Sequence, residues 1–363
     1  PAVFRVDEEM TVIYKNFING NTIRDLIVGC GGRILNVQVA KDIELNKYSG
    51  HLRIEAVWKR AQNYFNTALP KYFVDELEKA IDKIHSLGIT GLSITYGNIM
   101  LEKSTGNPVF IDFEGARGHK FKNSYSFFLR RDQDREKFNK IYGKKLLTYN
   151  GIKNLFKDDK FIDGTRYAPI DLGWGFATRG FWSVGTGTGR WDFFNRKVLG
   201  DMVKNKRILD LGSNNGLMPL MMLRDGAREV IGIEKSFDLA KQSIILKRLF
   251  EWKDMKQYNL KIISGDMLDI LKKEWGNFEL ITAFCSLYYL NSEDMARLVR
   301  KLSEMAPILV IQAKTDTRNL ATEGKTEKSS VNFLKKIISE NGFGNVDIFT
   351  QHGFTRPILI GKK

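Results

Sequence analysis

The chain has 363 residues, a formal net charge of +15 at neutral pH, 43% hydrophobic residues and 27% charged residues. This length allows two domains, because one hydrophobic core stops growing at roughly 250 to 300 residues. No apolar run reaches the roughly 18 residues that a membrane helix needs. The first residues, PAVFRVDEEM, lack the basic and apolar regions of a secretory signal. We therefore expect a soluble, cytoplasmic protein without a transmembrane segment.

The positive charge is spread over both halves of the chain. A basic surface is compatible with a polyanionic partner such as RNA, an anionic membrane or a phosphorylated glycan, and equally with a diffuse surface that binds nothing. The two cysteines, Cys30 and Cys285, lie far apart and lack metal-ligand spacing. Neither a disulfide framework nor a zinc site is expected, and we expect both to be buried thiols.

The first part of the chain, residues 1–145, predicts a mainly helical domain with a small β element. It contains the strand-like run TVIYKNFI, a long helical pattern in FVDELEKAIDKIHSLG, and two brief apolar runs near ITYGNIM and PVFIDF. Residues 146–175 are mixed, rich in Lys and Asp, and show no sustained period. We expect them to form the linker.

Residues 176–363 predict a second domain of the α/β class. Short apolar strands alternate with amphipathic helices, through the runs RILDLG, VIGIE, KIISGD, FELITAF and PILVIQ. Such alternation predicts a parallel sheet with helices on both faces. The last two runs, NVDIFT and RPILIG, follow a helical pattern that Gly342 is expected to end. They are close enough to form an antiparallel hairpin at the sheet edge.

The segment RILDLGSNNGLMPLMML carries the most chemical information. A buried strand ends at Asp210, passes a turn from Gly212 to Gly216, and enters a helix. Glycines let the backbone turn tightly and approach a ligand. The next strand ends in Glu234, whose carboxylate suits a ribose diol, and the third is followed by Asp266, which suits an adenine amino group.

Nicotinamide and flavin enzymes use a similar glycine-rich turn, so this turn alone is a weak signal. They require the spacing G-x-G-x-x-G around a pyrophosphate, whereas this chain has Asp-Leu-Gly-Ser-Asn-Asn-Gly, with an acid before the turn. A carboxylate there suits a sulfonium and an amino group and repels pyrophosphate.

On this D-x-G-x-x-x-G motif, residues 206–363 resemble the class I S-adenosylmethionine-dependent methyltransferases. The resemblance implies a Rossmann-like, seven-stranded and mostly parallel sheet with a C-terminal antiparallel hairpin. The alternative is an unrelated doubly wound domain. The cofactor residues that the resemblance implies are Asp210, Gly212, Asn214 and Gly216 at the amino-acid end, Glu234 at the ribose, and Asp266 and Met267 at the adenine, with Phe284 and Trp191 as further candidates.

The glycine- and aromatic-rich segment upstream of the first strand is expected to cover the cofactor or the substrate. Trp182, Arg190 and Trp191 are candidates to clamp a ligand by stacking or charge, and the alternative is that these aromatic residues pack on the sheet. Around Arg190 the chain is more loosely similar to tRNA wobble-uridine carboxymethyltransferases. A carboxylated S-adenosylmethionine would need an extra cation, for which Arg190 is the candidate.

The acceptor is expected to enter where the fourth strand ends, at Cys285-Ser286-Leu287-Tyr288-Tyr289. Methyl transfer depends chiefly on alignment, plus a base where the acceptor must lose a proton. Candidate catalytic residues are Tyr288, Tyr289 and Arg190, and the alternative is that one tyrosine packs inward and the other caps the cofactor. Cys285 is either a nucleophile or, more commonly for such a thiol, a buried side chain. His352 is not assigned as a base.

The segment HSLGITGLSITYGNIMLEKSTGNPVFIDFEGA resembles the catalytic core of the protein-kinase-like fold. Asn98 and Asp112 match its two metal-binding positions, and the catalytic aspartate five residues before Asn98 is replaced by Ser93. The chain also begins at the hinge-like strand, before which that family carries a glycine-rich loop and a lysine. The domain is expected to be a pseudokinase without a metal site, because Asn98 and Asp112 are vestigial, and to bind a substrate or a partner.

Together these patterns predict an S-adenosylmethionine-dependent methyltransferase whose kinase-like domain recognises the substrate. In known enzymes that join kinase-like and methyltransferase domains, a glycan phosphate is methylated, so the acceptor is expected to be a glycan or its phosphate. The alternatives are a tRNA-modifying enzyme of the wobble-uridine type, and a non-catalytic scaffold.

Overall fold

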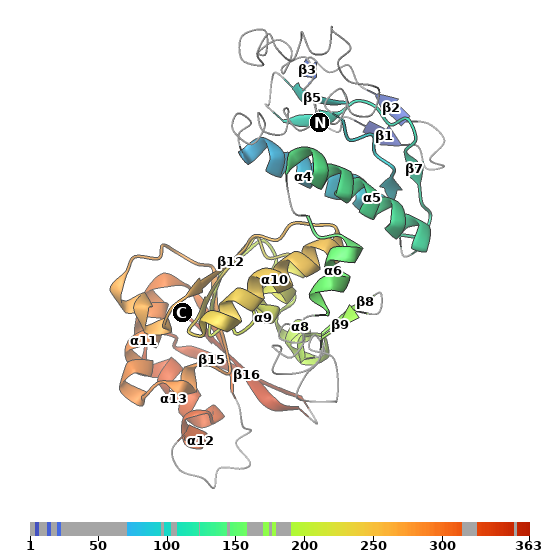
Figure 1. Ribbon diagram of the computed structural model, residues 1–363. Coiled ribbons are helices and arrows are strands. Elements are labelled where there is room, and N and C mark those ends of the chain that lie inside the picture. Colours follow the sequence, from blue (N-terminus) through green and yellow to red (C-terminus); the bar gives the residue numbers. More distant parts are fainter. Residues whose placement is uncertain are drawn as a thin grey trace, which may run out of the picture. The chain divides into compact units, whose positions relative to one another are not determined.

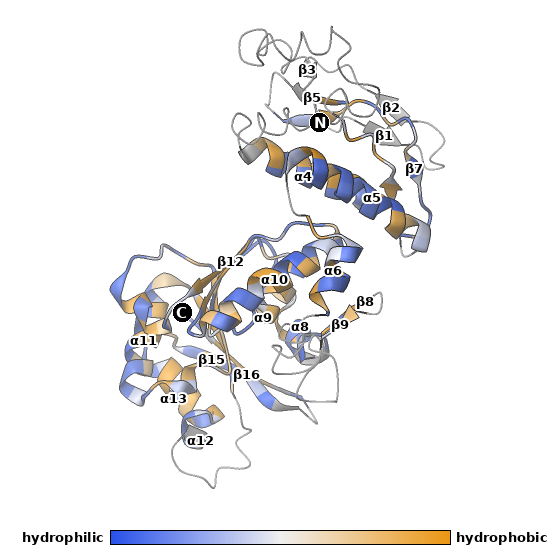
Figure 2. Ribbon diagram, viewed as in Figure 1, coloured by the Kyte–Doolittle hydropathy of each residue, from blue (hydrophilic) through white to orange (hydrophobic). Residues whose placement is uncertain are grey.

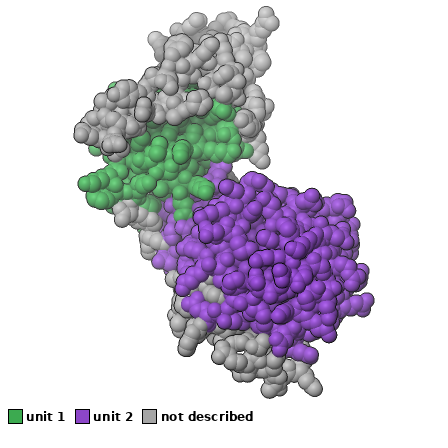
Figure 3. Space-filling view, turned by 180° about the vertical axis from the view of Figure 1, so that it is seen from behind, with its two compact units in different colours: residues 1–152, 254–256 green, residues 153–253, 257–363 purple. Residues whose placement is uncertain are grey.

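The computed structural model describes most of the C-terminal half of the chain and parts of the N-terminal half. The described residues are 4–6, 13–15, 20–22, 71–95, 98–102, 107–122, 124–143, 146–157, 170–173, 176–178, 190–313, 325–351 and 354–363. The chain divides into two compact units, one of residues 1–152 with 254–256, the other of residues 153–253 with 257–363 (Figure 3). The division between the units therefore falls within the stretch expected to be the linker, which also holds the helix α6 (Tyr149–Leu155).

The described residues of the first unit include the two long helices α4 (Lys71–Ser86) and α5 (Tyr125–Tyr142) and short antiparallel strands (Figure 1). Strand β1 (Phe4–Val6) pairs with β2 (Ile13–Lys15), and β4 (Ile89–Thr90) pairs with β7 (Arg117–Gly118). Strand β5 (Ile99–Glu102) pairs with both β3 (Gly20–Thr22) and β6 (Pro108–Phe110). The expected helical pattern after residue 72 is confirmed as α4. Its buried residues Phe73, Leu77 and Ile81 follow helical spacing and join one core with Ile99 and Phe110.

The second unit is built on a seven-stranded sheet in the order β12-β11-β10-β13-β14-β16-β15. The strands are β10 (Arg207–Leu211), β11 (Glu229–Glu234), β12 (Leu260–Ser264), β13 (Leu280–Phe284), β14 (Ile308–Gln312), β15 (Asn345–Gln351) and β16 (Phe354–Lys362). The first five are parallel, and β16 runs antiparallel to both β14 and β15. The α/β class, the mostly parallel sheet and the C-terminal antiparallel hairpin are thereby confirmed.

Helices cover both faces of this sheet, as right-handed crossovers require. The helices α9 (Leu217–Arg224) and α10 (Phe237–Asp254) lie on one face, and α11 (Ser292–Met305) and α13 (Val331–Glu340) lie on the other (Figure 1). Orange and blue alternate along α10, as expected for a helix that buries one side (Figure 2). The central strands are buried on both faces, so their sequences are continuous apolar runs.

Helix α13 shows how local sequence sets the elements of this unit. The side chain of Ser330 accepts a hydrogen bond from the backbone N–H of Phe333 and caps the helix start. After the helix, Gly342 has a φ of 105° and a Cβ there would lie 2.3 Å from Ser303 Oγ, so this position requires glycine. Its role as a helix stop is confirmed. Among the described residues, no helix has the length and apolar composition to span a membrane.

Candidate cofactor and acceptor site

The sheet order reverses between β10 and β13, and ligands of open α/β sheets bind at such a switch point, beyond the carboxyl ends of the strands. Three segments meet at this edge: the turn after β10, the end of β11, and the residues after β13. Strand pairing sets their mutual register, with Asp210 opposite Gly232 on one side and opposite Thr282 on the other.

The turn after β10 is shaped by close packing. Gly212 has a φ of 72°, and a Cβ there would lie 2.5 Å from the Cβ of Ser286. Gly216 has a φ of 77°, and a Cβ there would lie 2.8 Å from the Cβ of Ser243. Asn214, between them, also adopts a left-handed φ of 54°. Both glycines are therefore fixed by conformation and by space, as the motif predicts.

Asp210 is the buried acid of the site, with 2% of its surface exposed. Its Oδ1 accepts a 2.6 Å hydrogen bond from Thr282 Oγ1. Burial raises the pKa of Asp210 to about 6. The hydrogen bond from Thr282 and the charge of Arg190 act in the opposite direction but are outweighed by burial. A carboxylate that burial disfavours gains most from a cationic ligand, so Asp210 fits a sulfonium or ammonium group.

Glu234 joins the end of β11 to the glycine turn. Its Oε2 accepts from the backbone N–H of Asn214 at 2.7 Å, and its Oε1 accepts from that of Ser236 at 2.8 Å. Each carboxylate oxygen has a second lone pair, which leaves capacity for a ribose diol. The structure brings Asp210, Gly212, Asn214, Gly216 and Glu234 together at one edge of the sheet; their assignment to a cofactor remains a prediction.

The predicted adenine residues lie at the start of a short 3-10 helix, η2 (Met267–Lys272). Asp266 caps this helix by accepting from the N–H of Leu268, and its other oxygen accepts from Lys235 Nζ at 2.9 Å. These interactions, the helix cap first, lower the pKa of Asp266. Met267 Cε lies 3.8 Å from the Cβ position of Gly212, so this side chain faces the glycine turn. Phe284, the last residue of β13, is 8% exposed.

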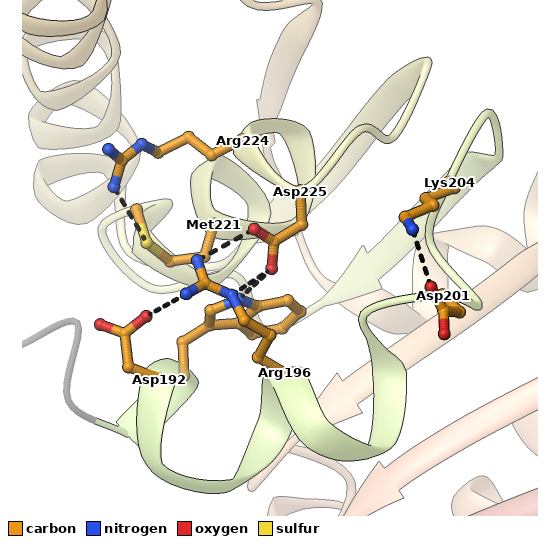
Figure 4. A network of polar contacts seen from close by, with 8 residues as sticks. Asp192, Arg196, Asp201, Lys204, Met221, Arg224 and Asp225 are labelled. Carbon is orange, nitrogen blue, oxygen red and sulfur yellow. Dashed lines mark hydrogen bonds and ion pairs between the residues drawn. The ribbon is translucent and has the colours of Figure 1, made fainter.

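Trp191 lies elsewhere. It is fully buried, and its indole N–H donates to Asp225 Oδ2 at 2.7 Å, at the end of α9 opposite to the glycine turn. Arg196 bridges the same Asp225 and Asp192 (Figure 4). This placement favours the alternative in which Trp191 packs on the sheet. Trp182 and His352 lie outside the described residues.

The residues after β13 separate the two tyrosines. Tyr288 is 4% exposed and Tyr289 is 63% exposed, with ring centroids 5.0 Å apart. Burial, followed by the neighbouring Cys285, raises the pKa of the Tyr288 hydroxyl well above its ordinary value, so Tyr288 is a poor base. Tyr289 stays accessible to a ligand at this edge. Cys285, with a left-handed φ of 58°, is partly buried.

Sequence reasoning named Arg190 as a candidate but missed the cluster that it forms around Cys285. Arg190 and Arg356 both donate to its sulfur, and the side chain of Gln312 contacts Arg190 in turn. Gln312 is fully buried at the end of β14. Besides Arg190, the sequence signal for this cluster was a glutamine as the last residue of an apolar strand.

The kinase-like positions of the first unit also come together. The side-chain amide of Asn98 donates to Ser93 Oγ at 2.7 Å and to Asp112 Oδ2 at 3.1 Å, while Asp112 Oδ1 accepts from the N–H of Glu114. Among the described residues, no group of three or more His, Cys, Asp or Glu side chains is placed to hold a metal ion. Whether this unit has a kinase-like fold stays a prediction.

The loop that carries Ser93 is held by a residue that the sequence did not point to. Asp134, on α5, has no exposed side-chain surface and accepts from the N–H groups of Gly91 at 2.8 Å and Leu92 at 2.9 Å. His85 Nε2 lies 3.1 Å from its Oδ2. Burial is the main cause that lowers the pKa of His85, so the imidazole is neutral and donates this hydrogen bond.

The comparisons with known proteins find structures but no sequence family. No family model and no curated protein match the chain. The N-terminal domain of EvdMO1, solved with SAH and D-fucose, matches 58% of this chain and 96% of its own at 12% identity and a TM-score of 0.43. Monomeric WbdD matches 49% of this chain at 16% identity and a TM-score of 0.39.

A chain assigned as an O-methyltransferase in Nostoc punctiforme matches 48% of this chain at 11% identity and a TM-score of 0.40. This chain spans 56% of the Nostoc chain and 42% of WbdD, and so covers about half of each. One of these neighbours is described as an O-methyltransferase, and another was solved with SAH. At such scores the architecture rests on the strand order of the sheet itself.

Proposed function

We propose that the second unit is an S-adenosylmethionine-dependent methyltransferase. The observation that carries this proposal is the buried Asp210 at the topological switch point, next to a turn that only glycines fit. S-adenosylmethionine supplies an activated methyl group. Asp210 would bind the positively charged amino-acid end, Glu234 the ribose, and Asp266 with Met267 the adenine, while Phe284 closes one wall.

The proposed binding predicts a pH dependence. A cationic ligand favours ionised Asp210, whose pKa is about 6 without ligand, so affinity falls as pH drops through that value. We expect S-adenosylmethionine to bind about tenfold more weakly at pH 5 than at pH 7.5, because roughly a tenth of Asp210 is then ionised. Calorimetric titration at both pH values measures this, and the same affinity at both would contradict the role of Asp210.

The first unit is proposed to bind the acceptor or a partner rather than to transfer phosphate. Ser93 lacks the charge of a catalytic aspartate, and the Asn98 amide is already bonded to Ser93 and Asp112. We expect no ATP turnover in an assay of phosphate release with Mg²⁺. Turnover that disappears in Asp112→Ala would show that this unit is an active kinase.

The proposed acceptor is a glycan or its phosphate. The second candidate is tRNA, which the net charge of +15 favours. Transfer of a tritiated methyl group to each acceptor class tests these candidates. A tRNA enzyme should also lose RNA affinity steeply as salt rises, because phosphate contacts release counterions, whereas binding of a glycan should not. Absence of transfer to both, with intact cofactor binding, would favour the scaffold alternative.

A further inference from the structure

Two arginines from opposite ends of the second unit meet at one sulfur atom. Arg190, which precedes the sheet, places Nη2 3.1 Å from Cys285 Sγ. Arg356, on the antiparallel strand β16, places Nη1 at the same distance from the same atom. Because both nitrogens contact the same sulfur atom, the Arg190 and Arg356 side chains lie next to each other. The fold therefore concentrates two guanidinium groups at the carboxyl end of β13.

A fully buried glutamine fixes this arrangement. The Gln312 side chain donates from Nε2 to Asn195 Oδ1 at 3.1 Å and to the backbone carbonyl of Arg356 at 3.2 Å. Its Oε1 accepts a hydrogen bond from Arg190. The Gln312 amide thus joins residues 190–195 to strand β16, so the arginines are held in place before any ligand arrives.

Among the described residues, no carboxylate forms a hydrogen bond or an ion pair with Arg190. Its hydrogen-bond acceptors among the described residues are the Cys285 sulfur and the Gln312 amide oxygen, and its buried Nε has no hydrogen-bond partner there. Burial first, with Arg356 adding to it, lowers the pKa of Arg190. A buried cation is costly unless an anion accompanies it. Asp210 lies in electrostatic range, but its Oδ1 is bonded to Thr282.

We propose that Arg190 and Arg356 form a subsite that binds an oxyanion of the methyl acceptor, either a phosphate or a carboxylate. The inference rests on the proposed methyltransferase function and adds the acceptor chemistry to it. A thiol sulfur is a weak hydrogen-bond acceptor, whereas oxyanions bind guanidinium groups strongly and with two parallel hydrogen bonds. An arriving oxyanion therefore replaces the Cys285 sulfur as the acceptor at little cost.

The subsite adjoins the proposed cofactor site. Ser286, the residue after Cys285, packs against Gly212 and donates from Oγ to the carbonyl of Leu211 at 2.6 Å. A bound oxyanion would thus lie close to the methyl donor. Arginine contacts would orient it and select it over neutral hydroxyl groups.

An oxyanion also removes the need for a base. Tyr288 holds its proton, and Asp210 faces Thr282. An ionised oxygen attacks the methyl carbon with its own electron pair, the oxygen–carbon bond forms, and the carbon–sulfur bond breaks with its pair left on sulfur. No proton moves. A phosphate monoester dianion becomes a methyl diester monoanion, and a carboxylate becomes a neutral methyl ester.

Binding of small probes to the full chain, with and without S-adenosylhomocysteine, tests the subsite. The probes are phenyl phosphate, benzoate and benzyl alcohol. Calorimetry measures the binding of each probe, and phosphorus NMR also measures the binding of phenyl phosphate. We expect at least one anion to bind and benzyl alcohol not to bind. Arg356→Gln and Arg190→Gln should each weaken anion binding at least about tenfold. Arg297→Gln, an exposed arginine on α11 paired with Asp294, is the matched control and should change nothing.

Which anion binds more tightly identifies the acceptor group as phosphate or carboxylate. Equal anion affinity in the parent and both subsite variants, or equal binding of benzyl alcohol, would overturn the subsite. The thermal midpoint of each variant shows that it is folded, and the partly exposed Arg356 provides the safer of the two substitutions. The chain could also bind an anion through both arginines and yet not bind S-adenosylhomocysteine. That result would support the subsite and contradict the methyltransferase proposal.

Discussion

Asp134→Ala is expected to lower the free energy of unfolding of the first unit by about 3–5 kcal/mol, because three hydrogen-bond donors lose their shared acceptor. The lost carboxylate accepts from the N–H groups of Gly91 and Leu92 and from His85. In the variant these donors lose their acceptor, and each buried donor left unpaired costs about 1–3 kcal/mol. Urea unfolding, with hydrogen exchange resolved by peptide, measures the loss.

The loss should be confined to residues 71–143, with exchange in 207–313 unchanged. Glu136→Ala is the matched control, because Glu136 lies on the same helix and is exposed. Surface substitutions of this kind change stability by about 0.5 kcal/mol or less. If Asp134→Ala unfolds no more easily than Glu136→Ala, Asp134 does not hold the loop of Ser93.

Asp210→Asn is expected to weaken S-adenosylmethionine binding by about 100-fold, which corresponds to about 2.7 kcal/mol. The asparagine oxygen can still accept the hydrogen bond from Thr282, so the substitution removes the charge and little else. Calorimetric titration at pH 7.5 measures the change. Asp225→Asn, at the opposite end of α9, is the matched control and should leave the affinity unchanged.

The same variant should be more stable than the parent. The pKa of Asp210 is raised from 3.8 to about 6 in the folded protein, so the native state loses stability as pH rises between these values. Asparagine removes this cost, which amounts to as much as about 3 kcal/mol at pH 7.5 and to little at pH 4. A variant that binds the cofactor as well as the parent does would contradict the account, whatever its stability.

The fold of the second unit follows directly from local patterns. Its central strands are buried on both faces, so each appears as an apolar run, and Gly212 and Gly216 mark the turn where the chain must adopt positive φ. Gly342 marks the end of α13 for the same reason. These features depend on neighbouring residues, which is why sequence periodicity predicts them.

The polar clusters depend on residues far apart in the chain. Arg190, Gln312 and Arg356 come from three segments and meet only after the sheet has formed. The helix α5 buries Arg131, Asp132, Asp134 and Arg135, although a run of charges along a helix ordinarily predicts a solvated face. No spacing rule indicates which charges in such a run have partners elsewhere.

Calorimetric titration of the full chain with S-adenosylhomocysteine, S-adenosylmethionine and NAD tests the central claim most directly. We predict that both adenosyl compounds bind with dissociation constants in the micromolar range, about 8 kcal/mol of binding free energy, and that NAD does not bind. Binding of NAD, or of none of the three, would contradict the claim, because the buried Asp210 and the glycine turn would then serve another ligand or none.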